Sequence, residues 1–296
     1  MSIATEIMAI IMSFITMISS IAGIIAEKPD FVPDQGFETK QENAIRIMSF
    51  NIRCTTVGRM DREDRVPLVT ETILEADADS FGVQEATTEW MADLDEMVGD
   101  IYAHVGVGRD DGVDAGEHSA IFYLKDKYKV IDHGDFWLSE TPDVLSVDCG
   151  GQYRICTWVI LENKETGEQY VHINAHFNNS SAEARAHSVD LILDKAAEFD
   201  KLPVVFTADM NVEEGSVDYK NITNNGTLKD SKYAAGSTMS FLTYHDTHPR
   251  RNQDQIIDYI MINSGFKALT YRVVTQGVNG NYVSDHYPIY SDLIFA

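Results

Sequence analysis

The sequence predicts an α+β domain in which two β-sheets pack against each other with helices on their outer faces. Predicted strands outnumber predicted helices, and their order is not the regular alternation of a doubly wound parallel sheet. After residue 43 the chain shows no second linker, repeat or low-complexity segment, so about 250 residues form one domain, a size that single β folds reach. The 44% apolar content is sufficient for a large core.

The first 26 residues form a hydrophobic segment of their own. Residues 7–26 carry no charge and are about long enough to span a bilayer as a helix. Ser20-Ile21-Ala22 resembles a signal-peptide cleavage site, although Glu6 stands where a basic residue is usual. We expect a leader or membrane anchor over 1–26, with membrane contact through 7–26 in a secreted or anchored protein. The alternative is a cytoplasmic protein whose N-terminal helix packs on the domain or on a partner.

Residues 27–43 are predicted to be a linker, because they contain prolines, a glycine and few apolar residues. The predicted domain occupies 44–296. Its three cysteines, Cys54, Cys149 and Cys156, show no zinc-binding spacing. A bridge between Cys149 and Cys156 would form only outside the cytosol.

Short apolar runs between polar turns predict the elements of the domain in order. Residues 44–52 alternate and then run apolar, as a buried strand does, whereas 65–78 have helical spacing. Residues 181–200 also carry apolar side chains at helical intervals, so this helix should cover a sheet face. The other predicted strands are 79–86, 119–125, 154–163, 169–177, 203–211, 255–263 and 287–293.

The charge balance argues against binding of long nucleic acids. The chain has 47 acidic and 23 basic residues, a net charge of -24, and no run of Lys or Arg. Non-specific affinity for nucleic acid comes largely from cationic contacts with phosphates, so no extended basic groove is expected. Cations are favoured partners instead.

Several predicted strands deliver a polar side chain at or near one end. Taken singly, each of these is explained by a turn or by a hydrogen bond in the core. Together they would form a polar cup at the rim of the two sheets, which usually persists because it binds something. The residues are Asn51, Glu85, His176, Asp209, Asn211, Asp258, Asp285 and His286.

The donor chemistry of this cup suits a hard cation. Carboxylate and amide oxygens bind Mg²⁺, for which Mn²⁺ can substitute, and Mg²⁺ keeps waters that a phosphate can displace. A metal with nearby carboxylates and imidazoles supports phosphoester hydrolysis. Neighbouring residues of an extended segment point to opposite faces, so Asp285 is expected on the metal side and His286 on the phosphate side.

A set of motifs, in this order along the chain, resembles the endonuclease/exonuclease/phosphatase superfamily. The resemblance covers 44–296 and implies a four-layer α/β sandwich of two packed mixed β-sheets flanked by helices, the DNase I-like fold. The motifs are MSFNIR (48–53), FGVQEA (81–86), AGEHSAIFY (115–123), NAHFNN (174–179), FTADMN (206–211), IIDYIMI (256–262) and SDHYP (284–288).

The resemblance implies roles for the metal side of the site. Glu85 resembles the principal metal ligand, with Asn51 contacting metal or phosphate and Asp285 as the acidic residue on the metal side. Asp209 corresponds to the aspartate that positions or activates the attacking water. Asn211 corresponds to the amide that holds a phosphate oxygen.

The resemblance also implies roles on the phosphate side. Asp258 resembles the carboxylate that orients His286. His176 looks like a second phosphate-facing imidazole, and Glu117 looks like its orienting carboxylate. Arg154 resembles a substrate-phosphate contact, although a surface arginine on an edge strand is an equal explanation.

Residues 105–143 further resemble a bacterial branch of the superfamily whose substrates are unsettled. Arg109, Asp110 and Asp111 are expected either to line the cleft, with Arg109 binding substrate, or to form a solvated turn. Where that branch carries a tryptophan-containing turn, this chain reads VLSVDCGGQYR (144–154), so the specificity loop is altered. His245 and His248 either reach substrate or are structural or exposed, and we expect the second.

Three functions follow. The first is a Mg²⁺-dependent hydrolase of a phosphodiester or phosphomonoester in a small molecule or short nucleic acid, and the second is an endo- or exonuclease on DNA or RNA. The third is a binding module without catalysis, which would lack a carboxylate or histidine of the site. Every expected position is filled.

Overall fold

Two mixed β-sheets form the framework of the computed structural model, which describes residues 34–199, 201–246, 255–278 and 282–296. The seven-stranded sheet contains, in spatial order, β10 (Ser237–Met239), β12 (Phe266–Val273), β13 (Ile289–Phe295), β1 (Ile45–Asn51), β2 (Ser80–Gln84), β4 (Ile121–Leu124) and β3 (Tyr102–Val105). The six-stranded sheet contains β5 (Tyr128–Trp137), β6 (Ile155–Asn163), β7 (Gln169–His176), β8 (Val204–Asp209), β11 (Asp258–Ile262) and β9 (Lys229–Asp230).

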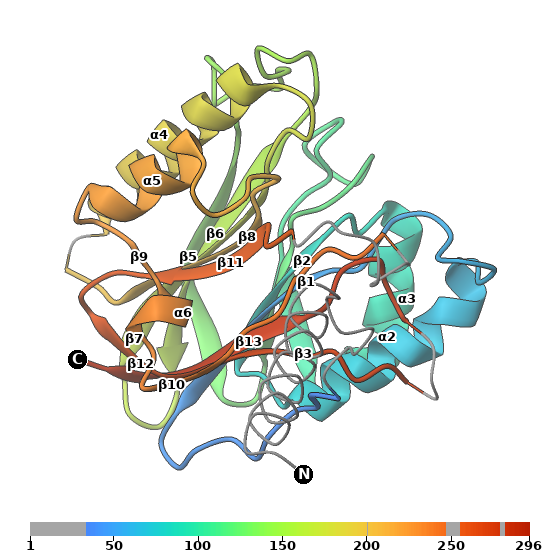
Figure 1. Ribbon diagram of the computed structural model, residues 1–296, viewed down its shortest axis with the longest axis vertical. Helices are drawn as coiled ribbons and strands as arrows, with labels where there is room; N and C mark the ends of the chain where they lie inside the picture. Colours follow the sequence, from blue (N-terminus) through green and yellow to red (C-terminus); the bar gives the residue numbers. More distant parts are fainter. Residues whose placement is uncertain (1–33, 200, 247–254, 279–281) are drawn as a thin grey trace, which may run out of the picture. The chain divides into compact units, whose positions relative to one another are not determined.

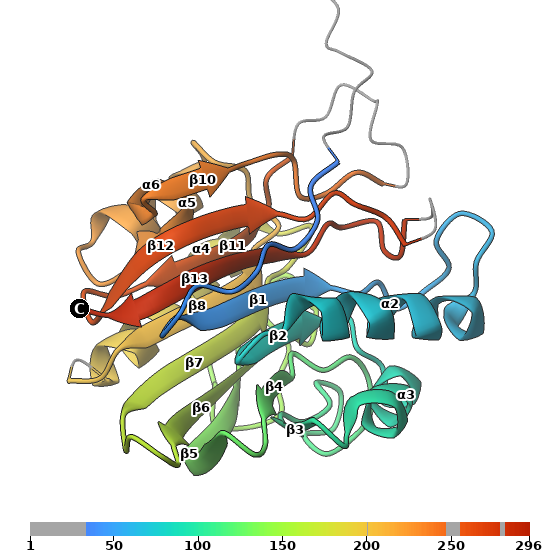
Figure 2. The same ribbon diagram turned by 90° about the horizontal axis from the view of Figure 1, so that it is seen from below.

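Helices cover the outer faces of both sheets (Figures 1 and 2). The apolar faces of α2 (Arg62–Ala76) and α3 (Thr88–Val98) pack on β1 and β2 in one core cluster. The apolar faces of α4 (Ala182–Glu198) and α5 (Val217–Asn224) pack on β7 and β8 in a second core cluster. The short α6 (Ser231–Ala234) leads to β10. The order helix, sheet, sheet, helix confirms the predicted four-layer sandwich.

Strand register brings the polar strand ends to one edge of the sandwich. In the first sheet, β1 runs parallel to β2 with Asn51 beside Gln84, so Glu85 follows at the same level. In the second sheet, β7 runs parallel to β8 with His176 beside Asp209. The antiparallel β11 begins beside Asp209 with Asp258. Residues far apart in the chain therefore meet where these strands end or begin.

The inner faces of the sheets are joined by buried polar contacts as well as apolar ones. Gln84 Nε2 donates to Asn174 Oδ1 at 2.8 Å across the interface. A Cβ on Gly82 would lie 2.3 Å from Thr207 Oγ1, so only glycine permits this approach. Paired polar groups of this kind hold the two sheets in one relative position, because an unpaired buried group would be unfavourable. The rim residues are thereby fixed with respect to each other.

The predicted strands and both predicted helices overlap observed elements, although the strand predicted at 255–263 begins only at Asp258. The sequence did not predict the helices α3, α5 and α6, or the strands β3, β5, β9, β10 and β12. The edge strand β5 is only partly buried and contains the polar stretch 132–135, so it has no apolar run to signal a strand. Edge position explains this pattern, since one long side of the strand meets solvent.

The compact unit begins at Gln35, within the segment predicted as a linker. Gln35 N donates to Thr275 Oγ1, and Glu38 N donates to the Tyr290 hydroxyl, both at 3.1 Å. The segment 35–43 therefore lies on the domain. The predicted leader over 1–26 lies outside the described residues. Among the residues that are described, no helix combines the length and hydropathy needed to cross a bilayer.

The cysteines are all free. Cys149 is exposed in a loop, whereas Cys156 is buried within β6. The bridge considered for Cys149 and Cys156 is thus not formed.

Candidate active site

A cavity of about 640 Å³ opens at the edge where the polar strand ends meet. Most of the predicted site residues line it, namely Glu85, Arg109, Glu117, Arg154, His176, Asp209, Asn211 and His286. The lining is completed by Arg53, Cys54, Thr55, Gln152, Asn179, Tyr244, Gln255 and Ile257. The structure therefore brings most of the predicted residues together around one cavity and adds the residues of its other walls.

Three cavity residues have backbone conformations that are unfavourable for side chains with a Cβ. Arg53, Glu85 and Asn211 have φ values of 60°, 61° and 51°. A bulky residue in the left-handed region costs about 1–3 kcal/mol and persists where the surroundings enforce it, commonly at functional sites. These three residues lie one or two positions after the ends of β1, β2 and β8, where the backbone leaves the strand and turns into the cavity.

Glu85 presents an ionised carboxylate to the cavity. Its Oε1 accepts from Asn51 Nδ2 at 3.1 Å, and its Oε2 accepts from Cys54 N at 3.0 Å. Burial alone would raise the pKa of Glu85, but the hydrogen bonds from Cys54 and the positive charge of His286 outweigh it and lower the pKa to about 2. The carboxylate is available to a cation over the whole physiological range.

Asp258, His286 and Asp209 form a buried chain of acid, imidazole and acid. His286 Nδ1 donates to Asp258 Oδ2 at 2.9 Å, and its Nε2 lies 3.7 Å from Asp209 Oδ2. Burial lowers the pKa of His286, but the Asp258 carboxylate outweighs it, with a smaller effect of Asp209, and the pKa rises to about 10. His286 is therefore an imidazolium at neutral pH. The predicted orientation of His286 by Asp258 is present in the structure.

Asp209 lines the cavity and is almost fully buried. Its Oδ2 accepts from Asn51 Nδ2 at 2.9 Å, and its Oδ1 accepts from Asn211 N at 2.9 Å. Burial and the charge of Asp258 raise the pKa of Asp209 to about 7. A carboxyl group with a pKa near the working pH can exchange a proton with water, as a general base must.

His176 and Asn211 are directly bonded on the side facing the arginines. Asn211 Nδ2 lies 3.0 Å from His176 Nε2 and 3.1 Å from the carbonyl oxygen of Phe177. Burial, followed by the charge of Arg154, keeps the pKa of His176 well below its usual value. A neutral ring that accepts from Asn211 through Nε2 carries its proton on Nδ1.

Glu117, which was expected to orient His176, forms no hydrogen bond with it in this structure. Its Oε2 lies 3.9 Å from His176 Nδ1, beyond hydrogen-bond range. Glu117 instead forms a bidentate pair with Arg109, at 2.7 and 2.9 Å. The arginine competes successfully because its planar fork matches a carboxylate.

The loop around Arg109 combines the two expected alternatives. Arg109 lines the cavity, whereas Asp111 turns its carboxylate to the amides of Val113, Asp114 and Ala115 in an exposed turn. Asp110 is about half exposed.

Asn51 and Asp285 lie behind the cavity wall. Asn51 joins Glu85 to Asp209, as described above, and is fully buried. Asp285 forms an ion pair with Arg53 at 3.1 Å, and the Ser284 hydroxyl donates to Asn51 O. Asp285 and His286 do diverge, as expected for neighbours, with His286 lining the cavity and Asp285 turned to the Arg53 side.

The sequence missed the far wall, which Tyr244, Gln255 and Ile257 form beside His286. The Tyr244 ring lies 4.9 Å from that of His286, measured between centroids. Gln255 and Ile257 lie in the segment predicted as a strand at 255–263, and Tyr244 lies outside every predicted strand, but the sequence predicted no role in the site for any of the three. His245 packs between the rings of Tyr282 and Tyr287 and is structural, as expected, while His248 lies outside the described residues.

Arg53, the last residue of the MSFNIR motif, and Cys54, which follows it, also line the cavity, although the sequence predicted no role for either. Burial and the charge of Glu85 raise the pKa of Cys54 to about 12, so it is a neutral thiol at physiological pH. The ligands offered to a cation are thus oxygens.

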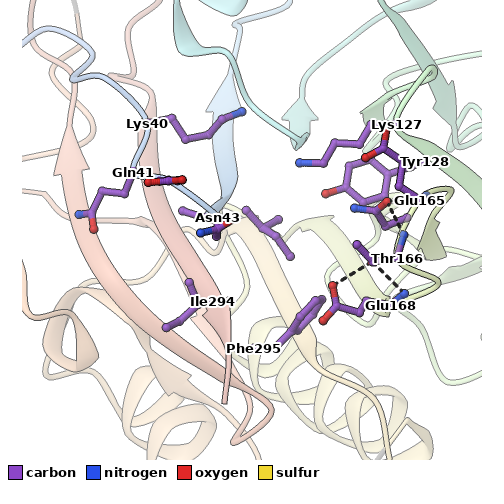
Figure 3. A pocket seen from close by; sticks show the side chains of 14 residues that line it. Lys40, Gln41, Asn43, Lys127, Tyr128, Glu165, Thr166, Glu168, Ile294 and Phe295 are labelled. Carbon is purple, nitrogen blue, oxygen red and sulfur yellow. Dashed lines mark hydrogen bonds between the residues drawn. The ribbon is translucent and has the colours of Figure 1, made fainter.

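A larger cavity, of about 820 Å³, lies where β1 begins and β13 ends, away from the strand ends that carry the acids (Figure 3). Lys40 and Lys127 point into it, and both donate to the buried Asp79. Tyr128 donates to the same carboxylate. These groups satisfy each other, and no imidazole of the described residues lines this cavity, so its size alone does not make it the reaction site.

The raised pKa of His286 predicts how the stability of the metal-free protein depends on pH. The folded chain binds the proton of His286 more tightly than the unfolded chain does. Protonation of His286 therefore stabilises the fold in full below about pH 6.5. This stabilisation is lost as the pH rises through about 10. Urea unfolding in EDTA at pH 6 and pH 10.5 should show a loss on the order of a few kcal/mol. His286→Gln should reduce that loss, whereas His133→Gln, at an exposed site on β5, should leave it unchanged.

The two stacked sheets with outer helices, and a rim of carboxylates and imidazoles at their edge, define a DNase I-like α/β sandwich. The chain belongs to the endonuclease/exonuclease/phosphatase family, whose model matches residues 48–286. Members of this family are generally hydrolytic phosphoesterases.

Solved structures of other proteins resemble this chain over most of its length. A mannosyl-6-phosphatase of Bacteroides thetaiotaomicron is 31% identical, with a TM-score of 0.79, over 85% of this chain and 100% of its own. A family protein from Bacteroides vulgatus is 32% identical, with a TM-score of 0.80, over 86% of this chain and 100% of its own. The human Nocturnin catalytic domain shares the fold at 18% identity, with a TM-score of 0.69, over 87% of this chain and 97% of its own. A comparison with curated proteins found no match.

Proposed function

We propose that the protein is a divalent-metal-dependent hydrolase of phosphoesters in small molecules, with sugar phosphates as the first candidates. The observation that carries the proposal is the convergence of Glu85 with the Asp258–His286–Asp209 chain on one cavity. The similarity to a mannosyl-6-phosphatase supports a sugar phosphate. The excess of acidic residues disfavours a long polyanionic substrate.

Two places in the site offer ligands to a cation. Asp209, Asp258 and His286 have ligand atoms within 4.8 Å of one another. An imidazolium cannot bind a metal, however, and His286 already donates to Asp258. Glu85 is ionised and lines the cavity, which suits Mg²⁺ or Mn²⁺ with several retained waters. Glu85 would hold the ion, with Asn51 and Asp285 beside it.

When bound, the ion would supply positive charge next to the phosphoryl oxygens. The residues of the chain do the rest. Asp209 is placed to orient water and accept its proton, because its carboxylate is held by Asn51 and by the backbone of Asn211. His286 is placed to donate to an oxygen whose charge grows in the transition state, with Asp258 keeping it protonated and oriented.

The two alternatives make different demands. A nuclease would need contacts along a polyanion, and the balance of 47 acidic to 23 basic residues provides few. A binding module without catalysis would tolerate loss of a carboxylate or imidazole, yet the predicted set is complete around the cavity or directly behind it.

Removal of divalent metal is the direct test. Protein treated with EDTA should hydrolyse p-nitrophenyl phosphate and mannose 6-phosphate at least about 10²-fold more slowly, because the charge on the phosphoryl oxygens would be uncompensated. Mg²⁺ or Mn²⁺ should restore the rate. The same preparation, tested on lysophospholipids, plasmid, single-stranded DNA and poly(A), separates a phosphatase from a nuclease. Full activity in EDTA would contradict the metal requirement, and faster turnover of the polymers would favour the nuclease.

A further inference from the structure

Three nitrogen atoms of the active-site cavity have no hydrogen-bond partner among the described residues, although they are buried. They are Arg154 Nη1, Arg109 Nε and His176 Nδ1. Arg154 is only 5% exposed and His176 only 7%. Buried N–H groups in folded proteins are nearly always paired, so unpaired donors from three segments around one cavity indicate a ligand with acceptor atoms.

Arg154 is the strongest of these donors. It stands just before β6, where its Nε and Nη2 both donate to Gln152 Oε1, at 3.1 and 2.8 Å. Gln152 is neutral, so it orients the guanidinium without balancing its charge. Arg109 differs, because its charge is balanced by the bidentate pair with Glu117. The open Nη1 group of Arg154 therefore calls for an anion.

The position of His176 indicates which anionic group of a substrate would bind here. Its Nε2 lies 3.4 Å from Asp209 Oδ2, the carboxylate placed to orient the attacking water. Its proton is on Nδ1, on the side of Glu117 and Arg109. His176 is close enough to Asp209 for its Nδ1 donor to meet the phosphoryl group itself, and Arg154 and Arg109 line the same cavity.

We propose that Arg154, assisted by Arg109 and His176, makes the protein selective for phosphomonoesters by binding an oxygen that a diester has esterified. The inference rests on the proposed function and specifies its substrate class. A monoester offers three unesterified oxygens and up to two negative charges. A diester would place an alkyl or aryl group against buried N–H donors and leave them unpaired, which a site built for hydrogen bonding rejects strongly.

The test compares two substrates with the same leaving group, p-nitrophenyl phosphate and methyl p-nitrophenyl phosphate, on the full chain with saturating Mg²⁺. The wild type should prefer the monoester. Arg154→Met should lower kcat/KM for the monoester by about 10²–10³-fold and for the diester by less than about 3-fold. Arg154→Lys should recover part of the monoester activity, because it keeps the charge but loses the fork. Arg59→Met, at an exposed site, is the matched control and should change neither rate.

An equal loss on both esters in Arg154→Met, or a wild type that prefers the diester, would overturn the selectivity. If Arg154→Met fails to show a wild-type thermal transition, Gln152→Ala decides instead, since it keeps the guanidinium but removes its support. A loss of about 10-fold confined to the monoester is then expected.

Failure of the proposed function gives a different result. A wild type that hydrolyses neither ester with Mg²⁺ or Mn²⁺ rejects the hydrolase. In that case calorimetry with inorganic phosphate and dimethyl phosphate tests the anion site alone. Binding of phosphate that is lost in Arg154→Met supports the site, and equal binding of both anions refutes it.

Discussion

Glu85→Gln is expected to lower kcat/KM for a phosphoester by about 10²–10⁴-fold at saturating Mg²⁺, the range for losing a group that stabilises transition-state charge. The substitution keeps the shape of the side chain. It removes the negative charge that, with a pKa of about 2, is present at every working pH. The cavity would then offer the cation a neutral amide where it now offers a carboxylate.

Two controls isolate this effect. Glu96→Gln, at an exposed position of α3, makes the same chemical change away from the cavity and should leave activity within about twofold. Mn²⁺ binding by the Glu85→Gln protein, followed by calorimetry without substrate, should weaken in parallel with activity. A variant that binds Mn²⁺ as tightly as the wild type would show that the ion sits elsewhere, with the Asp209 cluster as the remaining place.

The location of the site was readable from the sequence because it depends on strand ends. The strand periodicity places Asn51 and Glu85 at the ends of neighbouring runs, and parallel pairing puts such ends on one edge. Asp209 and His176 follow the same rule in the second sheet. No single segment predicts that the two sheets pack with these edges together. That expectation came from the order of the motifs along the chain.

The contacts of individual side chains were harder to foresee. Glu117 was expected to orient His176, but Arg109 is closer and offers a better-matched partner. Asn51 was expected to touch metal or phosphate, and that role stays a prediction; the sequence did not show that its Nδ2 also donates to both Glu85 and Asp209. Such choices depend on distances of about an ångström between loops, which residue types and spacing do not determine.

The cavity wall formed by Tyr244 and Gln255 could not be predicted from the sequence for the same reason. It comes from irregular chain, with only isolated bridges from Tyr244 to Gln255 and to His286. The strand β5 was missed on different grounds, since an exposed edge strand needs few apolar residues. Periodicity thus predicts the buried framework, and tertiary contacts decide the rest.

His286→Ala is expected to reduce kcat by about 10³–10⁴-fold, because it removes the charged donor closest to Asp209. Asp258→Asn should cost about 10²-fold, since the ring remains but loses the carboxylate that keeps it protonated and fixed through Nδ1. The two residues act as one unit, so the double variant should be no slower than His286→Ala alone. Exposed His133→Ala is the control for the substitution. Losses that multiply in the double variant would mean that Asp258 acts independently of His286, for example by holding a cation with Asp209. The metal site would then be assigned to the cluster of Asp209, Asp258 and His286 instead of to Glu85.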